Sequence, residues 1–517
     1  MGTLRARLFP MGAVLVTIGV LLHFPDYLDS RHHHFMMAGM PMSDTMWAGM
    51  GFIVIGLVLG GVAVVPPRGL RTRAPASAGA AFHAIDDAPL TGSHLWLIVL
   101  LTFGLVVDTM KPASLGFVVP GMAHEYGLTT SETSLLPFTA IVGTVIGSMV
   151  WGYAADLIGR RATLMFSGLI FVSTSICGFM PSFELNLVMC FLMGASAGGM
   201  LPTVYSLTSE SIPAKRRGAL VVLQSGIGAA CGYLVASGSA TLLIPSFSWR
   251  SLWLLGLPSG LLLLVMCRWI PESPRFLLAQ GRVAEAHRVM AKYGIVAGSP
   301  PAAETRFAVA PKSLSLRTLL VAPYRRRTVA VAAYGLAWGI INWGFVTFLP
   351  TFLRSGELSE NVSSTLFFAS LFAIPSTLCA AYMYGRWSSR RSLAVVGFVA
   401  TLALGAFALA VGKGAAAAVL FVLLAAIFAS SAGMIAMLSP YSAEQYPTSL
   451  RARGTGLVAA MTKAGGMLGP LVVSGVPRLE IAAIATTLPV LVATVVLLVL
   501  GTETSQRRLV ELEPVNS

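Results

Sequence analysis

The sequence predicts an all-α membrane protein that crosses the bilayer many times. Of its 517 residues, 56% are hydrophobic and only 11% are charged, and the mean hydropathy is +0.78. A soluble domain carries about 25% charged residues, so a soluble fold is excluded. Apolar segments of about 20 residues, the length that spans a bilayer as a helix, follow one another along the chain. Patterns in the first half recur in the second half, which predicts an internal repeat.

The first two apolar segments, at 8–24 and 46–65, predict a membrane hairpin over residues 1–65. Basic residues flank this hairpin on both sides, and basic flanks face the cytoplasm. The segment 66–94 is rich in Pro, Ala and Gly, and we expect it to be a cytoplasmic linker.

The predicted external loop of the hairpin carries His32, His33, His34, Met36 and Met37. Imidazole and thioether groups bind copper, and thioethers favour Cu(I). The spacing matches no metal site that we can name, so two alternatives stand. The loop either holds copper or belongs to a packing or regulatory appendage, and the appendage is favoured.

Twelve further apolar segments divide into six and six around a long polar interval. A first six-helix bundle is expected at 95–269, a cytoplasmic central loop at 270–327, a second bundle at 328–500 and a cytoplasmic tail at 501–517. The predicted spans are 95–120, 133–154, 162–181, 185–208, 219–244, 250–269, 328–353, 363–384, 392–412, 415–440, 454–476 and 480–500.

The basic charge follows the positive-inside pattern. The formal net charge is +14, but the basic residues gather in connections between apolar segments. We therefore expect a lipid bilayer and no nucleic acid as the partner, with both termini in the cytoplasm. No disulfide framework, P-loop, HExxH motif or nucleophile elbow is present, so we expect no cofactor, no enzyme and no ATP-driven pump.

The connection between the second and third of the twelve spans reads GYAADLIGRR at 152–161. Gly152 and Gly159 predict close backbone approach and a tight turn. Asp156 is expected to meet a helix N-terminus, and Arg160 and Arg161 to face the anionic inner leaflet.

Several patterns recur across the two sets of six. ESIP at 210–213, followed by RRG, returns as EQYP at 444–447, followed by basic residues and glycine. The connection at 152–161 has a weaker counterpart, GRWSSRR at 385–391, which lacks the aspartate. Such internal repeats are typical of secondary transporters.

Together with PESPRFLL at 271–278, these patterns resemble the major facilitator superfamily, in particular its sugar-porter and aromatic-acid:proton symporter branch. The resemblance covers 95–500 and implies twelve helices as 6+6, to which the hairpin adds two. In that family the 152–161 connection contacts its neighbours differently in inward- and outward-open states. The resemblance thus implies gating roles for Gly152, Asp156, Gly159, Arg160, Arg161, Glu210, Arg217, Glu272, Arg275, Glu444 and Arg453.

Ionisable groups inside spans are costly and usually functional. Asp108 and Lys111 lie three residues apart on one face of the first span, roughly 20 Å from its start. Pro112 is expected to kink the helix there. Related proton symporters carry an acid at about this position, so we expect substrate binding by both residues and proton coupling by Asp108. The alternative is that the two charges only neutralise each other.

Lys463 lies near the middle of the eleventh span, where relatives often have an arginine that faces the central cavity. A cation there suits an anionic substrate such as a carboxylate. The alternative is a lysine that snorkels or pairs with a carbonyl. Other polar or aromatic candidates for substrate binding, which are alternatively packing or helix–helix contacts, are Gln224, Tyr334, Asn342 and Trp343.

Cys190 departs from the resemblance, because many proton-coupled relatives have an arginine at that place. Asp108 with Lys111 is the expected substitute, in which protonation of Asp108 frees Lys111 for an anion. We therefore expect a secondary transporter in a bacterial inner membrane that takes up a small organic anion with protons. Efflux of a drug-like compound, sugar transport, and a copper-responsive sensor remain alternatives, and the oligomeric state is open.

Overall fold

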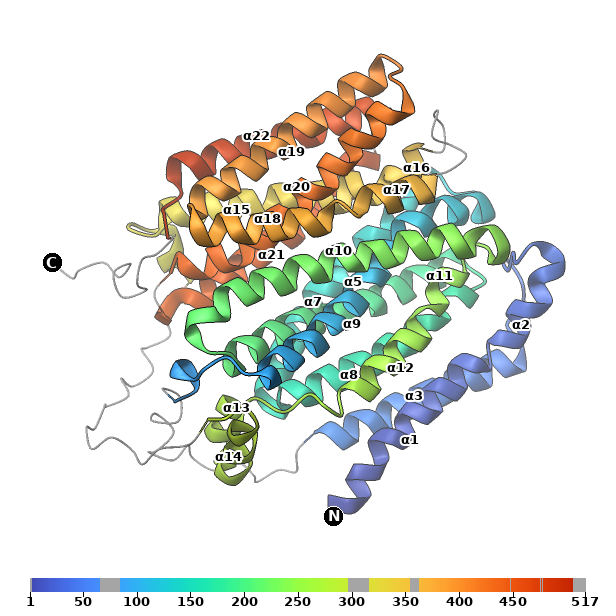
Figure 1. Cartoon of the computed structure of the whole chain (residues 1–517). Helices are drawn as coiled ribbons and strands as arrows, with labels where there is room; N and C mark the ends of the chain where they lie inside the picture. Colours follow the sequence, from blue (N-terminus) through green and yellow to red (C-terminus); the bar gives the residue numbers. More distant parts are fainter. Residues whose placement is uncertain are drawn as a thin grey trace. The chain divides into compact units, whose positions relative to one another are not determined.

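A computed structural model shows an almost entirely helical chain (Figure 1). The structure describes residues 2–65, 84–295, 316–353, 362–446, 448–474, 476 and 478–504. Most of the predicted linker, part of the central loop and the end of the tail lie outside the described residues. Among the described residues, 12 helices are long and apolar enough to cross a membrane.

Two of the fourteen predicted spans are present as helices outside those 12. The sixth span of the first set is short and broken, because α11 (Ser251–Leu254) is followed after Leu255 by α12 (Gly256–Met266). The eleventh is α21 (Thr448–Ser474), with 27 residues. Two arginines and Lys463 lower its apolar character. The fold is thus the expected twelve helices with two more at the N-terminus.

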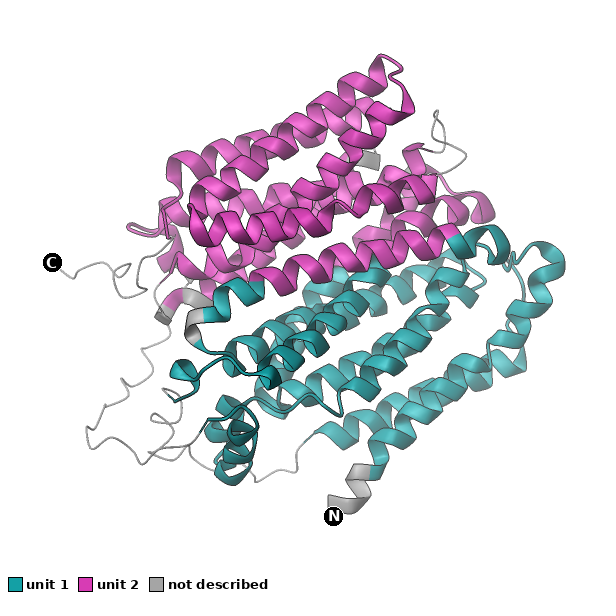
Figure 2. Ribbon diagram, viewed as in Figure 1, with its two compact units in different colours: residues 1–112, 142–221, 242–307 teal, residues 113–141, 222–241, 308–517 magenta. Residues whose placement is uncertain are grey.

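The chain separates into two compact units, coloured in Figure 2. Unit 1 contains residues 1–112, 142–221 and 242–307, and unit 2 contains 113–141, 222–241 and 308–517. The long helices α5 (Gly92–Tyr126), α7 (Leu135–Ile158) and α10 (Ala214–Phe247) each give part of their length to both units. In α5 the division falls directly after Pro112, through which the helix continues.

Unit 1 holds the hairpin and most of the first set of helices. Besides its parts of the three shared helices, its elements are α1 (Gly2–Leu21), α2 (Phe24–Asp29), η1 (Ser30–His33), α3 (Asp44–Val64), α8 (Arg160–Ser173), η2 (Thr174–Phe179), α9 (Phe183–Ser211), α11, α12, α13 (Pro274–Ala279) and α14 (Val283–Lys292).

Unit 2 holds the second set of helices. Besides its parts of the shared helices, its elements are α6 (Thr130–Thr133), η3 (Leu316–Leu320), α15 (Arg325–Gly339), the π-helical η4 (Ile340–Val346), α16 (Thr347–Leu353), α17 (Val362–Ser370), α18 (Ala373–Arg386), α19 (Ser389–Gly412), α20 (Ala417–Glu444), α21 and α22 (Leu479–Leu500).

The hairpin is held together by glycines. A Cβ atom at Gly12 would lie less than 3.0 Å from the backbone of Gly56, and one at Gly19 would lie that close to Gly49. Helices α1 and α3 therefore pack backbone to backbone, as small residues allow in membranes. Val16 of α1 is fully buried with Leu169 and Val172 of α8. The hairpin is thus a packed part of unit 1.

An aromatic cluster fastens the turn of the hairpin. The Tyr27 side chain is 2% exposed, and its hydroxyl donates to the Phe247 carbonyl of α10. Its ring centroid lies 5.0 Å from that of Phe35 and 5.5 Å from that of Phe179 of η2. His34 and Phe35 adopt positive φ angles of 55° and 60°, a strained conformation, and the Phe35 ring is buried.

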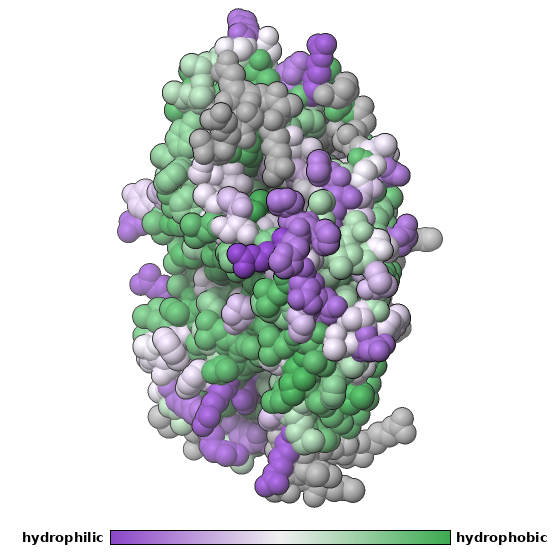
Figure 3. Space-filling view, turned by 90° about the vertical axis from the view of Figure 1, so that its right-hand side faces the viewer, coloured by the Kyte–Doolittle hydropathy of each residue, from purple (hydrophilic) through white to green (hydrophobic). Residues whose placement is uncertain are grey.

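Figure 3 shows the face that lies at the right of Figure 1, where hydrophilic residues gather among apolar ones.

Candidate functional site

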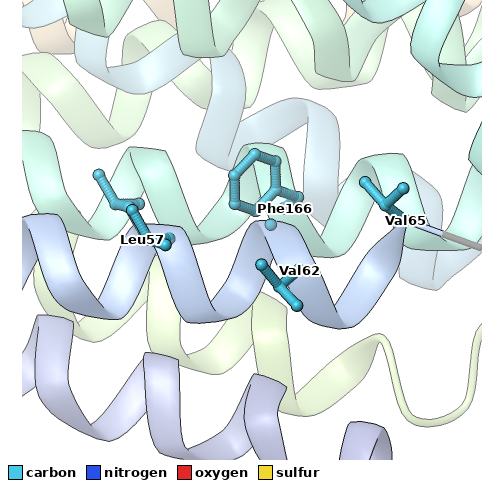
Figure 4. Close-up of a pocket in the computed structure, with 6 residues that line it drawn as sticks. Leu57, Val62, Val65 and Phe166 are labelled. Atoms are coloured by element: carbon cyan, nitrogen blue, oxygen red, sulfur yellow. The ribbon is translucent and has the colours of Figure 1, made fainter.

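An apolar hollow of about 570 Å³ lies between α3 and α8 (Figure 4). Its lining side chains carry no polar group to orient a solute: Leu57, Val58, Gly61, Val62, Val65 and Phe166. The solute site is therefore not assigned to this hollow. Polar residues inside the helices are the better candidates.

Lys111 is held against α8 within unit 1. The residue is 1% exposed, and its ammonium group donates to the Phe171 carbonyl at 3.0 Å and to the Thr174 hydroxyl at 2.6 Å. The same group lies 4.5 Å from the centre of the Phe171 ring, a cation–π contact. Gly256 of α12 leaves room for it, because a Cβ atom there would lie 2.6 Å from Nζ. These hydrogen bonds were not anticipated from the spacing of Lys111 and Asp108.

Asp108 is 5% exposed on the same helix, α5. It lies 16 residues from Gly92 in a helix of 35 residues, or about 24 Å along an axis of roughly 52 Å. A carboxyl group at this depth is the strongest candidate for a proton-binding group in unit 1.

The π-helical segment η4 interrupts the middle of a span in unit 2 and contains both Asn342 and Trp343. Such π segments widen the helix and are frequent at functional sites. Both side chains are partly buried. The sequence did not predict this interruption, although Asn342 and Trp343 were both predicted as candidates for substrate binding.

Helix α21 packs against this segment backbone to backbone. Gly344 of η4 and Gly469 of α21 approach so closely that a Cβ on either would lie less than 3.0 Å from the other. A Cβ at Gly466 would lie 2.9 Å from the Trp343 ring. Lys463, one turn before Gly466, is partly buried. Lys463 thus lies on a helix that packs tightly against the interrupted segment η4.

The remaining binding candidates are buried. Tyr334 is 0% exposed, and its hydroxyl donates to the Leu393 carbonyl of α19 at 2.8 Å. This bond joins α15 to α19. It corresponds to the alternative named above for Tyr334, a helix–helix contact. Gln224 on α10 is 1% exposed.

Arg160 is the centre of a charge network at the predicted cytoplasmic end of unit 1. Its guanidinium group lies 3.0 Å from Asp156 and 2.9 Å from Glu210 of α9. It also donates to the Ala155 carbonyl at 3.1 Å. One arginine thus joins the end of α7 to the end of α9.

Glu272 caps the N-terminus of α8. Its carboxylate accepts from the backbone N–H groups of Arg160 at 2.8 Å, Arg161 at 3.2 Å and Ser273 at 3.0 Å. A carboxylate there satisfies free N–H groups and the helix dipole. Burial nevertheless raises the pKa of Glu272 above its ordinary value, and these backbone hydrogen bonds oppose that shift.

The two glycines of the 152–161 connection differ. Gly159 has a φ angle of 101°, and a Cβ there would lie less than 3.0 Å from the Glu272 carboxylate. At Gly152 a Cβ would meet no described atom within 4 Å. The expectation of close backbone approach at Gly152 is therefore wrong, because that residue lies on an open side of α7.

Asp86 was not among the residues predicted from the sequence. This residue lies in a helical turn at 84–87, and its carboxylate pairs with Arg217 of α10 and, at 2.6 Å, with Arg275 of α13. It brings together two arginines to which the resemblance gave gating roles. The net basic character of the connections could have prompted a search for such a counter-ion.

Glu503 was also missed. Its carboxylate accepts from the Ser389 N–H at 2.9 Å and from the Ser389 hydroxyl at 2.6 Å. It therefore caps α19 in unit 2 as Glu272 caps α8 in unit 1. Glu444 accepts from the hydroxyls of Tyr384 and Thr504, both at 2.6 Å.

Arg453 and the His/Met residues of the hairpin loop are the remaining predicted site residues. Arg453 lies partly buried near the start of α21. In the hairpin loop, Met37 is 2% exposed whereas Met36 is 44% exposed, and His32–His34 are exposed. Within the described part of the chain, no three His, Cys, Asp or Glu side chains come together as a metal site.

Long apolar helices with charged groups at mid-span define a multi-pass membrane transporter. A family model described as Major Facilitator Superfamily matches residues 98–470. The chain therefore belongs to the Major Facilitator Superfamily.

Three similar curated proteins are named as transporters of niacin, 4-hydroxybenzoate and gallate. The niacin transporter NiaP of Acinetobacter baylyi is 27% identical over 436 residues, which are 82% of this chain and 98% of the relative. The 4-hydroxybenzoate transporter PcaK of the same organism is 30% identical over 406 residues, which are 74% of this chain and 85% of the relative. A gallate transporter of Pseudomonas putida is 29% identical over 410 residues, covering 75% of this chain and 86% of the relative.

Solved structures agree on the fold. The xylose transporter XylE from E. coli, in a partially occluded inward open conformation, superposes with a TM-score of 0.64 at 15% identity. The match covers 81% of this chain and 100% of that chain. Since relatives and structural neighbours are transporters, the expectations of a transporter and of no enzyme are confirmed.

Proposed function

We propose that this chain takes up an aromatic carboxylate together with protons across a bacterial inner membrane, with both termini in the cytoplasm. The observation that carries the substrate class is the set of relatives named for niacin, 4-hydroxybenzoate and gallate. These three compounds share an aromatic ring that bears a carboxylate group. The likeness to a xylose transporter concerns the fold alone.

Lys463 is the proposed partner of the substrate carboxylate. It lies 15 residues from Thr448 in a helix of 27 residues, or about 22 Å along an axis of roughly 40 Å. An ammonium group at that depth is costly unless it faces a cavity or a partner. Asn342 and Trp343 on the neighbouring π-helical segment are proposed to line the same site.

Asp108 is the proposed proton-binding group. Its carboxyl is almost completely buried at mid-span, where neutral and charged forms differ strongly in solvation. The hydrogen bonds of Lys111 to α8 support a role in which this lysine fixes α5 and supplies positive charge near the acid.

The charge network at the predicted cytoplasmic end is proposed to gate access. In unit 1, Arg160, Glu210, Asp86 and the capping carboxylate of Glu272 hold helix ends by ion pairs and hydrogen bonds. In unit 2, Glu503 caps α19. Such contacts have two discrete arrangements when helices tilt, which is what a gate requires.

Uptake into proteoliposomes tests the substrate. Labelled 4-hydroxybenzoate and nicotinate should accumulate under an inside-alkaline pH gradient, whereas xylose and a lipophilic cation should not. Lys463→Ala should weaken uptake by about 10- to 100-fold, the cost of a lost charge-assisted hydrogen bond, and Lys463→Arg should retain part of it. Lys413→Ala, an exposed lysine at the end of α19, is the matched control. Accumulation of xylose alone would refute the proposed substrate class.

Proton coupling is tested separately. Asp108→Asn should keep exchange of substrate across the membrane but lose its dependence on the pH gradient. Unchanged pH dependence in this variant would end the proposed role of Asp108.

A further inference from the structure

Three aromatic side chains from three helices meet within unit 2. The Tyr233 ring of α10 has its centroid 4.7 Å from that of Phe428 of α20 and 5.9 Å from that of Phe117 of α5. Both pairs are tilted, at 49° and 55°, an arrangement that aromatic rings favour. The two phenylalanines thus form apolar walls beside the tyrosine.

The Tyr233 hydroxyl is buried, and no described residue forms a hydrogen bond with it. The rest of the side chain is partly exposed. A buried hydroxyl without a partner is costly, and native structures keep few of them. Phenylalanine would fill the same volume without that cost, so the hydroxyl needs a partner that the described residues do not supply.

The position of Tyr233 in depth agrees with a solute site. It lies 17 residues from Arg216 in a span of 32 residues, or about 26 Å along roughly 48 Å. Phe428 lies 11 residues into a span of 28, about 16 Å along roughly 42 Å. Both are therefore near mid-membrane, as Lys463 is, where a polar atom finds no bulk water.

We propose that Tyr233 determines specificity by donating a hydrogen bond to a polar atom on the substrate ring, while Phe117 and Phe428 contact the ring itself. This inference rests on the proposed function. The three compounds that name the relatives all carry such an atom besides the carboxylate, either a ring nitrogen or a hydroxyl oxygen. A benzoate ion has none.

Competition uptake in proteoliposomes tests the proposal with 4-hydroxybenzoate, nicotinate and benzoate. In Tyr233→Phe, apparent affinity for the first two should fall about five- to tenfold, as loss of one hydrogen bond predicts, whereas affinity for benzoate should change less than about twofold. Phe428→Leu should instead lower the apparent affinity for all three compounds by a similar factor. Tyr27→Phe, which removes a hydroxyl in the hairpin, is the control and should change no ratio.

The outcomes separate this proposal from the one on which it rests. If Tyr233→Phe lowers the apparent affinity for all three compounds equally, or for none, Tyr233 does not bond a polar atom on the substrate ring. The inference is then overturned while the substrate class stands. If the unaltered protein takes up no aromatic carboxylate, both proposals fall. The thermal midpoint without substrate should be unchanged or raised in Tyr233→Phe, because an unpartnered polar group is removed. A clearly lowered midpoint would show that the hydroxyl has a structural partner and would overturn the proposal.

Discussion

Gly159→Ala should destabilise the protein through the Glu272 cap. Gly159 has φ and ψ angles of 101° and 162°, a conformation essentially reserved for glycine, and a side chain there costs about 1–3 kcal/mol. The new methyl group would also lie less than 3.0 Å from the Glu272 carboxylate. Displacing that carboxylate weakens the hydrogen bonds that its charged oxygens accept from backbone N–H groups. Such bonds are worth about 1.5–3 kcal/mol, so weakening them costs about 1–2 kcal/mol. The expected total loss is about 2–5 kcal/mol.

A double-mutant cycle of Gly159 and Glu272 separates the backbone strain from the loss of the cap. In a Glu272→Ala background the carboxylate is already absent, so Gly159→Ala should cost only the backbone strain. The two changes together should therefore cost about 1–2 kcal/mol less than their sum. The free energy of unfolding is measured by denaturant titration of the purified protein in detergent, followed by helical circular dichroism.

Gly152→Ala is the matched control. A Cβ at Gly152 meets no described atom within 4 Å, and alanine in a helix is favoured over glycine by up to about 1 kcal/mol. This variant should be at least as stable as the unaltered protein. Equal stabilities for Gly159→Ala and Gly152→Ala, or additive costs in the cycle, would refute the account of the cap.

Three further predictions concern charged side chains at helix ends, two of them in unit 1 and one in unit 2. Asp86→Asn should lower the unfolding free energy by less than about 1 kcal/mol, and less still at high salt, since its ion pairs are about one-third exposed; an effect independent of salt would contradict this. Tyr384→Phe should cost about 1–3 kcal/mol, because the Glu444 carboxylate loses a donor, whereas Tyr382→Phe, at a residue 68% exposed, should cost under about 0.5 kcal/mol. Because burial raises the pKa of Glu272, the folded protein binds that proton at a higher pH than the unfolded chain does. On lowering the pH from 7 toward 5, the unaltered protein should therefore gain stability relative to Glu272→Gln; a relative loss in that range would contradict the sign of the shift.

The membrane spans could be predicted because each apolar segment carries its own signal of length and composition. The spans predicted at 250–269 and 454–476 were also recognised as apolar segments, although their helices, around α12 and α21, are shorter or less apolar than the others. The interruption at η4 could not be foreseen, since the helix that packs against it, α21, is distant in sequence, as the contact of Gly344 with Gly469 shows.

The partners of charged groups were harder to predict than their positions. Spacing placed Asp108 and Lys111 on one face of α5, but the hydrogen bonds of Lys111 depend on which helix lies opposite. Asp86 lies 131 residues from one arginine partner and 189 from the other. Helical periodicity carries no information over such separations.

Glu503 reveals a part of the repeat that a comparison of the two connections does not show. Helix α8, which follows the 152–161 connection, is capped by Glu272, and helix α19, which follows 385–391, is capped by Glu503 from beyond α22. Each carboxylate lies more than 100 residues from the helix that it caps. The two halves therefore share a carboxylate at this helix N-terminus, although neither connection contains it.

The position of Glu503 also matters for protein engineering. The last span ends at Leu500, yet Thr502, Glu503 and Thr504 bond to Tyr441, Ser389 and Glu444. An affinity tag or fluorescent reporter joined directly after Leu500 would remove these contacts although it leaves every membrane span intact. Fusions should therefore be joined beyond Thr504, and an expression screen of the two junctions would read out the contribution of this short segment to assembly.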